Sequence, residues 1–391
     1  MKVLFIHHGS HAGGAPLSML YTMQGLQKKG YRPIAALIKP SDELHKLYND
    51  NGFETIETPW IPIFITWIGS EGKRYNPIVW RNIARIIWKW RKSKRKLLET
   101  LKLHQIDIVH LNSVCLSNCA SVLMEDNFPF VWHVREHGPF HQGFRYRFIK
   151  SKVLQAREVI FLSKAEQKSW TNGNSHGSIV NNFVSFDQFD SSIKEKESRT
   201  FYDVQNDKNV ILYVGGVKAH KGIVVLLSAL GRLKNEKCDF VCLMPDTMFD
   251  IDKPKSRLER KCARIIKKFK LSGNCKMMPF DPNIVKLFSA CDVLVFPATK
   301  PHFARPIVEA SAMGKPVVAP NIAVMDELVV NEKTGVLFKN SDPIDLSGKI
   351  ASILHNKEKS QLMGRRGYIF AREKFGSQSQ MEKILRIYNR L

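Results

Sequence analysis

Short apolar runs alternate with amphipathic helical stretches along almost the whole chain, and this alternation restricts the possible folds more than any other feature. Such runs are typical of strands that are buried on both faces. Strands separated by helices predict a mainly parallel sheet with helices on both sides. The runs form two successive series: Val3–Ile6, Ile34–Ile38, Ile106–His110, Phe130–Val134, Val159–Leu162 and Ser178–Val180, then Val210–Val214, Phe240–Met244, Cys275–Met278, Val293–Phe296, Pro316–Val318 and Val336–Phe338.

Two series predict an α/β protein with two doubly wound, Rossmann-like domains. A chain of 391 residues is also longer than a single hydrophobic core usually supports. The polar stretch 191–209 separates the series, so we predict a first domain at 1–190 and a second at 191–375, followed by a C-terminal helix at 376–391. Ligands of these sheets bind beyond the carboxyl ends of the strands, so we expect the two domains to face each other across a cleft.

The chain is strongly basic, with 60 Lys and Arg against 36 Asp and Glu and a net charge of +24. Both halves carry the excess, which is expected to attract nucleic acid, anionic lipid headgroups or a phosphorylated substrate. Composition does not choose among these partners. With 44% apolar and 25% charged residues, the composition excludes a disordered, collagen-like or coiled-coil protein.

The seven cysteines form no CxxC pair, and no second pair or histidine cluster in the sequence completes a zinc site. Most lie in apolar surroundings, which is typical of buried thiols in a reducing cytosol. The apolar run at the N-terminus is too short for a signal peptide. No window approaches about 18 uninterrupted apolar residues, so we predict no membrane-spanning helix.

In each of the two series, a glycine-rich turn follows the first strand. The stretch 7–16 contains Gly13 and Gly14 before a helix, and the stretch 213–222 contains Gly215, Gly216 and Lys221. Glycines at a strand-to-helix turn let the backbone approach a ligand, and a helix N-terminus attracts an anion. Neither turn has the GxGxxG or Walker pattern. A phosphate-binding role and a tight turn without a ligand both remain open.

The most specific stretch runs from 293 to 338 as strand, loop, helix, glycine stop and strand. Glu309 lies in the first turns of this helix, where a carboxylate suits hydrogen bonds to ribose hydroxyls. The alternative is a glutamate favoured only by the helix dipole, an effect of about 0.3–1 kcal/mol.

These motifs resemble the group 1 (family 4) glycosyltransferases of the GT-B fold. The resemblance covers nearly the whole chain and is strongest at 290–340. It implies an acceptor-binding first domain, a nucleotide-sugar-binding second domain and a C-terminal helix that returns to the first domain. It also implies that Lys221 holds the donor diphosphate, that Gly13 and Gly14 approach the phosphates, and that Glu309 and Glu327 lie near the nucleotide.

The chain departs from the family pattern at two donor-binding positions. Pro301 stands where the family has a glutamate facing the donor sugar, and Gly216 replaces an arginine. We therefore expect His302 or backbone groups to hold the sugar, with altered donor choice or reduced activity as consequences. The predicted donor-binding residues are Gly13, Gly14, Gly215, Gly216, Lys221, His302, Phe303, Ala304, Arg305, Glu309 and Glu327.

The strand Phe130–Val134 leads into a polar stretch, and family members often place a histidine after this strand. If the strand continues, residues 133, 135 and 137 point the same way. We predict His133, Arg135 and Glu136, with Lys221, as catalytic residues. A structural role for the set is the alternative.

The stretch 80–96 holds eight Lys and Arg and no acidic residue, with tryptophans at helical spacing. Cations and indoles on one helix suit an anionic membrane surface, whereas a core-facing stripe with a solvated basic face is the alternative. A second basic helix at 256–270 extends the positive surface or is solvated. The predicted membrane contacts are Trp80, Arg81, Arg85, Trp88, Lys89, Arg91 and Lys92.

The resemblance implies a retaining glycosyltransferase that uses a UDP- or GDP-sugar and a lipid-linked or cell-surface glycan acceptor in polysaccharide biosynthesis. Because no metal-binding motif stands out, we expect no metal to be required. A cytoplasmic enzyme held at the inner face of the membrane fits the basic stretch. A binding protein of the same shape that has lost catalysis is the alternative. A nucleic-acid partner is not expected, because an aromatic and basic readout motif is missing.

Overall fold

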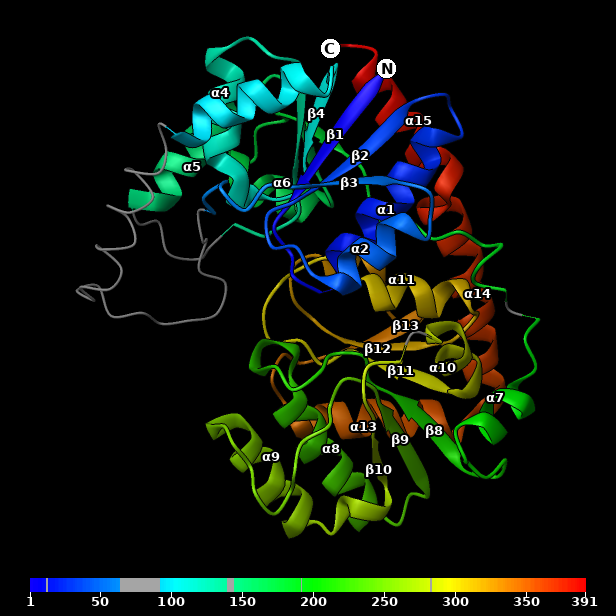
Figure 1. The fold of residues 1–391 in the computed structure, drawn as a ribbon. Coiled ribbons are helices and arrows are strands. Elements are labelled where there is room, and N and C mark those ends of the chain that lie inside the picture. Colours follow the sequence, from blue (N-terminus) through cyan, green and yellow to red (C-terminus); the bar gives the residue numbers. More distant parts are fainter. Residues whose placement is uncertain (12, 64–91, 139–143, 191, 282) are drawn as a thin grey trace. The chain divides into compact units, whose positions relative to one another are not determined.

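The computed structural model describes residues 1–11, 13–63, 92–138, 144–190, 192–281 and 283–391. The chain divides into two compact units, one made of 1–182 and 378–391 and the other of 183–377. Each unit is an α/β domain built on a parallel sheet, which confirms the predicted fold class (Figure 1).

The first unit contains a seven-stranded parallel sheet in the order β3-β2-β1-β4-β5-β6-β7. Strand order reverses between β1 and β4, where a doubly wound sheet places its ligand site. Its elements are β1 (Lys2–His7), α1 (Gly14–Gln27), β2 (Arg32–Leu37), α2 (Asp42–Asn49), β3 (Glu54–Glu57), a helix at 92–103, β4 (Ile108–Leu111), η1 (Val114–Leu116), α4 (Ser117–Glu125), β5 (Phe130–Val134), α5 (Phe144–Gln155), β6 (Val159–Phe161), α6 (Lys164–Thr171) and β7 (Ser178–Ile179).

The central strands of this sheet are mostly apolar, as expected for strands that are covered on both faces. Every residue of β4 and β5 is buried. Helix α1 lies on one face and helices α4 and α5 on the other (Figure 1). Among the described strands of this sheet, only the edge strand β3 was not predicted, because its sequence Glu-Thr-Ile-Glu has a single apolar side chain and is half-exposed.

The last helix, α15 (Ser377–Tyr388), belongs to the first unit although it follows the second in sequence. Arg390 donates two hydrogen bonds to the Glu158 carboxylate, at 2.9 and 2.7 Å. The Asn181 amide donates to the Gln380 side chain at 3.0 Å. The helix also packs on α1, where a Cβ on Gly25 would lie 2.5 Å from the sulfur of Met381. The C-terminal segment therefore completes the first unit.

The second unit contains a six-stranded parallel sheet in the order β10-β9-β8-β11-β12-β13. Helices α8, α9 and α13 lie on one side of it and α10, α11 and α14 on the other (Figure 1). The elements are α7 (Glu195–Phe201), β8 (Asn209–Leu212), η2 (Ala219–Lys221), α8 (Ile223–Asn235), β9 (Phe240–Met244), α9 (Arg257–Lys268), η3 (Leu271–Gly273), β10 (Cys275–Met277), α10 (Ile284–Ala290), β11 (Val293–Val295), α11 (Arg305–Ala312), β12 (Val317–Pro320), α12 (Met325–Leu328), β13 (Gly335–Phe338), α13 (Pro343–His355) and α14 (Lys357–Phe375).

The boundary between the units falls at 182/183, before the polar stretch that the sequence suggested. Phe189 explains the difference, because its ring packs 6.4 Å from that of Phe288 in the second unit. Val184 also forms an isolated bridge to Gly376. The apolar residues that precede the polar stretch therefore belong to the second core.

Candidate active site

In the second unit, the turn after β8 is held in a conformation that requires glycine. Gly216 has φ +63°, and a Cβ there would lie 2.8 Å from the Asp246 carboxylate. Gly222 has φ +77°, and a Cβ there would overlap the carbonyl oxygen of Pro297 after β11. The Tyr213 hydroxyl donates to the Gly216 carbonyl at 2.9 Å. An arginine at position 216, as in the family pattern, would be strained in this backbone.

Lys221 ends the short helix η2 in this turn. Its Nζ lies 2.6 Å from Nε2 of His302 and 5.5 Å from the centroid of the Phe296 ring. Because Nδ1 of His302 lies 2.9 Å from the Lys300 carbonyl, we assign the imidazole proton to Nδ1, and Nε2 then accepts from Lys221. Burial, and then the charge of Lys218, lower the pKa of Lys221 to about 8. The lysine is therefore a poorly solvated cation that an incoming anion would stabilise.

Helix α11 begins after the loop that carries His302. Arg305 and Glu309 form a buried pair across one helical turn, with Nε and Oε1 2.6 Å apart. Burial of both partners orients the Glu309 carboxylate. Ala304 is the N-cap of α11, and the ring of Phe303 packs edge-on against Phe375. Residues 302–305 thus lead consecutively into α11, and Glu309 lies one turn into the helix.

Glu327 lies in α12, the short helix after β12. The Lys374 ammonium donates to its backbone carbonyl at 2.6 Å, which ties α12 to α14.

In the first unit, Gly13 is the N-cap of α1, and Gly14 begins that helix. A Cβ on either glycine would have no neighbour within 4 Å among the described residues. The backbone at this helix end is therefore approachable.

Polar side chains gather at the carboxyl ends of β4 and β5 in the first unit. Strand β5 ends at Val134, so the strand alternation expected for 133, 135 and 137 does not extend beyond it. Arg135 instead donates to Asn112 and, at 2.7 Å, to Asn182. Neither asparagine was predicted, because each lies on a separate segment.

Glu136 follows Arg135 and is held by three hydrogen bonds. Its carboxylate accepts from the Ser113 hydroxyl at 2.5 Å, from the Val114 amide at 3.0 Å and from the Arg135 amide at 3.1 Å. Three donors to one carboxylate restrict its position strongly. The orientation of Glu136 is therefore determined by the loop after β4.

His133 lies at the end of a chain of buried hydrogen bonds. Tyr388 and Nδ1 of His110 are 2.8 Å apart, and Nε2 of His110 lies 3.3 Å from Nδ1 of His133. Arg135 also contacts Nδ1 of His133, at 3.4 Å. Because arginine only donates, we assign Nδ1 of His133 as the acceptor and place its proton on Nε2. That Nε2 is buried without a hydrogen-bond partner among the described residues. Burial lowers the pKa of His133 well below 6.5.

Potential metal ligands come together at one place among the described residues. One group of three emerges, made of His8, Cys115 and Glu136 in the first unit. Around Lys221, in the part of the second unit that the structure describes, no such group occurs.

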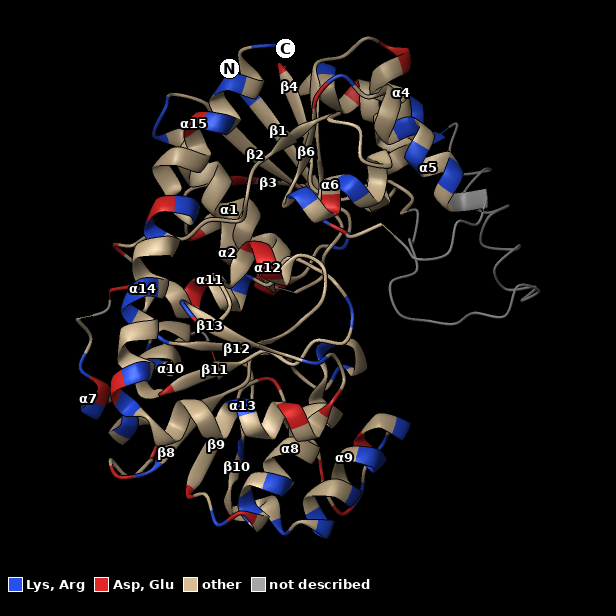
Figure 2. Ribbon diagram, turned by 180° about the vertical axis from the view of Figure 1, so that it is seen from behind, with Lys and Arg blue, Asp and Glu red and all other residues tan. Residues whose placement is uncertain are grey.

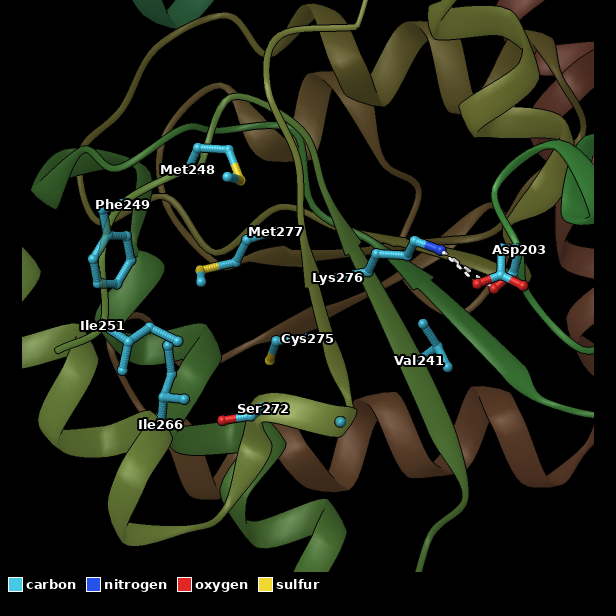
Figure 3. A pocket seen from close by; sticks show the side chains of 11 residues that line it. Asp203, Val241, Met248, Phe249, Ile251, Ile266, Ser272, Cys275, Lys276 and Met277 are labelled. Carbon is cyan, nitrogen blue, oxygen red and sulfur yellow. Dashed lines mark hydrogen bonds and ion pairs between the residues drawn. The ribbon is translucent and has the colours of Figure 1, made fainter.

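A cavity of about 530 Å³ lies at the β10 edge of the second sheet (Figure 3). Met248, Phe249 and Ile251 line one side, and Lys276, which is ion-paired with Asp203 at 3.5 Å, lies on the other. None of the predicted site residues lines this cavity.

Of the predicted membrane contacts, Trp80, Arg81, Arg85, Trp88, Lys89 and Arg91 lie outside the described residues. Lys92 is the first described residue of the helical stretch 92–103 and is exposed. The second predicted basic helix is α9, which begins with a Ser256–Glu259 capping box and shows many basic residues (Figure 2). No helix among the described residues is long and apolar enough to cross a membrane.

Residues 194–370 match the family model for glycosyl transferases group 1. An uncharacterized glycosyltransferase of Methanocaldococcus jannaschii is 25% identical over 301 residues, which cover 73% of this chain and 76% of that protein. The N,N'-diacetylbacillosaminyl-diphospho-undecaprenol alpha-1,3-N-acetylgalactosaminyltransferase of Campylobacter jejuni is 27% identical over 42% of this chain and 40% of its own length. For several other curated relatives the match spans about half of their length or less.

The crystal structure of Anabaena HepE in complex with UDP and glucose superposes with a TM-score of 0.81 at 20% identity and covers both chains completely. This likeness shows the fold, and the sequence matches show a similarity to glycosyltransferases. The chain therefore has the GT-B fold, and its residues 194–370 match the group 1 glycosyltransferases.

Proposed function

We propose that the protein transfers a sugar from a UDP- or GDP-sugar to a lipid-linked or cell-surface glycan acceptor, with retention of the anomeric configuration. HepE was crystallised with UDP and glucose, which supports a nucleotide-sugar donor. The name of the Campylobacter relative includes a diphospho-undecaprenol acceptor, which supports a lipid-linked glycan. Retention follows from the resemblance to family 4.

The observation that carries the donor proposal is the position of Lys221. Its ammonium group lies between a neutral imidazole and an aromatic ring, and no carboxylate among the described residues forms an ion pair with it. A donor diphosphate would supply the missing negative charge. Gly215 and Gly216 would let the backbone approach the phosphates, and the negative charge developing on the leaving nucleotide would be stabilised without a metal ion.

The remaining donor contacts are assigned to the start of α11. Glu309, oriented by Arg305, would accept hydrogen bonds from the ribose hydroxyls. His302 and the backbone of Phe303 and Ala304 would hold the sugar in place of the glutamate that Pro301 replaces. Glu327 would lie near the nucleotide.

In the first unit, we assign acceptor and catalytic roles to His133, Arg135 and Glu136, with Gly13 and Gly14 near the donor phosphates. Nε2 of His133 carries a proton that no described group accepts, so it is available to a hydroxyl oxygen of a substrate. The three hydrogen bonds to Glu136 fix the orientation of its carboxylate beside this histidine and Arg135.

We also propose that the enzyme works at the cytoplasmic face of the membrane, held there by the basic stretch 80–96. The eight cations in that stretch are the support for this assignment. Flotation with vesicles containing anionic lipid, but not with neutral vesicles, is the expected result. Equal flotation with both would contradict it.

A panel of nucleotide sugars tests the activity. We expect one UDP- or GDP-sugar to raise the melting temperature and to release nucleotide only when a glycan acceptor is present, with a rate that Mg²⁺ does not increase. The product linkage, read by NMR, should keep the donor's anomeric configuration. Lys221→Ala should abolish transfer, whereas Lys218→Ala should retain it, because Lys218 is exposed and lies 4.0 Å from Asp246. Absence of stabilisation by every donor would refute the proposal.

A further inference from the structure

His8, Cys115 and Glu136 come together at the carboxyl edge of the first sheet. His8 follows β1, Cys115 lies in η1 after β4, and Glu136 follows β5. These strands are neighbours in the order β1-β4-β5, and Leu111 of β4 pairs with Ile6 on one side and Trp132 on the other. The three segments therefore meet where their strands end.

One ring nitrogen of His8, the Cys115 sulfur and a Glu136 carboxylate oxygen all lie within 4.8 Å of one another. A tetrahedral zinc ion with bonds of about 2.0–2.3 Å would bring such atoms to about 3.3–3.6 Å from each other. The side chains would move closer together when an ion binds. Imidazole, thiolate and carboxylate are also the donor types that zinc prefers among protein side chains.

Surrounding hydrogen bonds hold the side chain of Glu136 and the backbone of Cys115 in place. Ser113 donates its hydroxyl proton to Glu136 at 2.5 Å and accepts from the Cys115 amide at 3.0 Å, so one residue links both segments. The Val114 and Arg135 amides complete the support of Glu136. Outer partners of this kind are typical of preorganised metal ligands.

The imidazole of His8, the third side chain, has a buried nitrogen without a hydrogen bond among the described residues. Nδ1 of His8 is buried and has no hydrogen-bond partner among the described residues. A buried imidazole nitrogen in that state costs free energy unless it meets a donor or a metal ion. Thiolate and carboxylate would together neutralise a divalent cation at this place, so the nearby Lys39 and Arg135 would not repel a net positive site.

We propose that His8, Cys115 and Glu136 form a site for one zinc-like divalent cation in the first unit, with a fourth coordination position open to water or a ligand. The proposal rests on the geometry of this unit and not on the proposed function. It is separate from the donor diphosphate, for which no metal is proposed. The expectation that no zinc site would form was based on sequence spacing, which does not detect ligands from three strands.

Titration of the full-length, chelator-treated protein with Zn²⁺ tests the site. We expect binding of one ion per chain, and at least a tenfold loss of affinity in Cys115→Ser and in His8→Gln. The matched control is Cys119→Ser. It changes another buried cysteine, four residues after Cys115 and in α4, and it should bind Zn²⁺ like wild type. The control also reports binding by the other cysteines and histidines.

Co²⁺ supplies a second measurement, because cobalt bound to a thiolate gives intense near-ultraviolet absorption. That absorption should appear in wild type and in Cys119→Ser and be lost in Cys115→Ser. Circular dichroism of each variant in chelator establishes that it is folded, and His8→Gln decides the matter if Cys115→Ser does not fold. Absence of one-to-one binding, or unchanged affinity in both ligand variants, would overturn the proposal. A donor assay that succeeds or fails leaves this result unaffected.

Discussion

The ammonium group of Lys221 lies 2.6 Å from Nε2 of His302. The two residues are separated by 81 positions and come from the loops after β8 and β11, which are adjacent strands. The imidazole follows Pro301, the position at which the family pattern has a carboxylate. In this chain a neutral hydrogen-bond acceptor, instead of a negative charge, therefore contacts the lysine proposed to bind the diphosphate.

This contact predicts that donor binding weakens above pH 8. The pKa of Lys221 is lowered to about 8, so its charge is lost from the unliganded protein as the pH rises through that value, whereas the bound diphosphate requires the charge. Affinity for the nucleotide sugar should fall by up to about tenfold per pH unit above 8. Calorimetric titrations at pH 7, 8 and 9 measure it. Lys221→Arg remains charged, so its affinity should depend less on pH. Parallel pH profiles of the wild type and this variant would contradict the explanation.

Substitution of Gly222 should strongly destabilise the second unit. Gly222→Ala adds a Cβ that overlaps the Pro297 carbonyl at φ +77°, so we expect the free energy of unfolding to fall by about 2 kcal/mol or more. The matched control is Gly348→Ala in α13, where a Cβ has no neighbour within 4 Å and helix propensity favours alanine by about 1 kcal/mol. Urea unfolding measures both. Equal changes in the two variants would argue against the close approach.

Buried histidines should make the first unit sensitive to acid. Burial, with a smaller contribution from Arg135, lowers the pKa of His110 to about 3, and burial likewise lowers that of His7 to about 3. Below pH 6.5 the unfolded chain therefore binds more protons, and stability falls as the pH drops from 6.5 toward 3. The loss for each is about 2 kcal/mol at pH 5.

Urea unfolding at pH 7.5 and 5 measures this loss. His110→Leu should lose less stability between the two values than wild type does. His355→Gln, which removes an exposed histidine, should behave like wild type. An unchanged dependence in His110→Leu would refute the assignment.

The hydroxyl of Tyr388 should matter for stability. Tyr388→Phe removes the 2.8 Å bond to Nδ1 of His110 and leaves that buried atom without a partner, which should cost about 1–3 kcal/mol. Tyr31 packs edge-on against Tyr388 at 5.7 Å, and Tyr31→Phe keeps the ring. We expect that control to change stability by less than about 0.5 kcal/mol. Thermal or urea unfolding of both variants and the wild type measures these changes in stability.

Local patterns predicted most of the fold, and their failures have local causes. The strand β3 was missed because two of its four side chains are glutamates. Glycine disfavours a helix interior, yet α14 runs through both Gly364 and Gly367. A Cβ on Gly364 would overlap the Gly314 carbonyl at the end of α11, so this glycine permits close helix packing.

The sequence by itself determined the two parallel sheets and the glycine turn that carries Lys221, because buried strands and tight turns depend on residues next to one another in the chain. The same holds for the start of α11 with Glu309. Only the tertiary structure decided that Arg305 pairs with Glu309, that Tyr388 bonds His110, and that His8, Cys115 and Glu136 converge. The last two depend on strand order and on the return of the C-terminal helix, since both bring together residues from segments far apart in the chain.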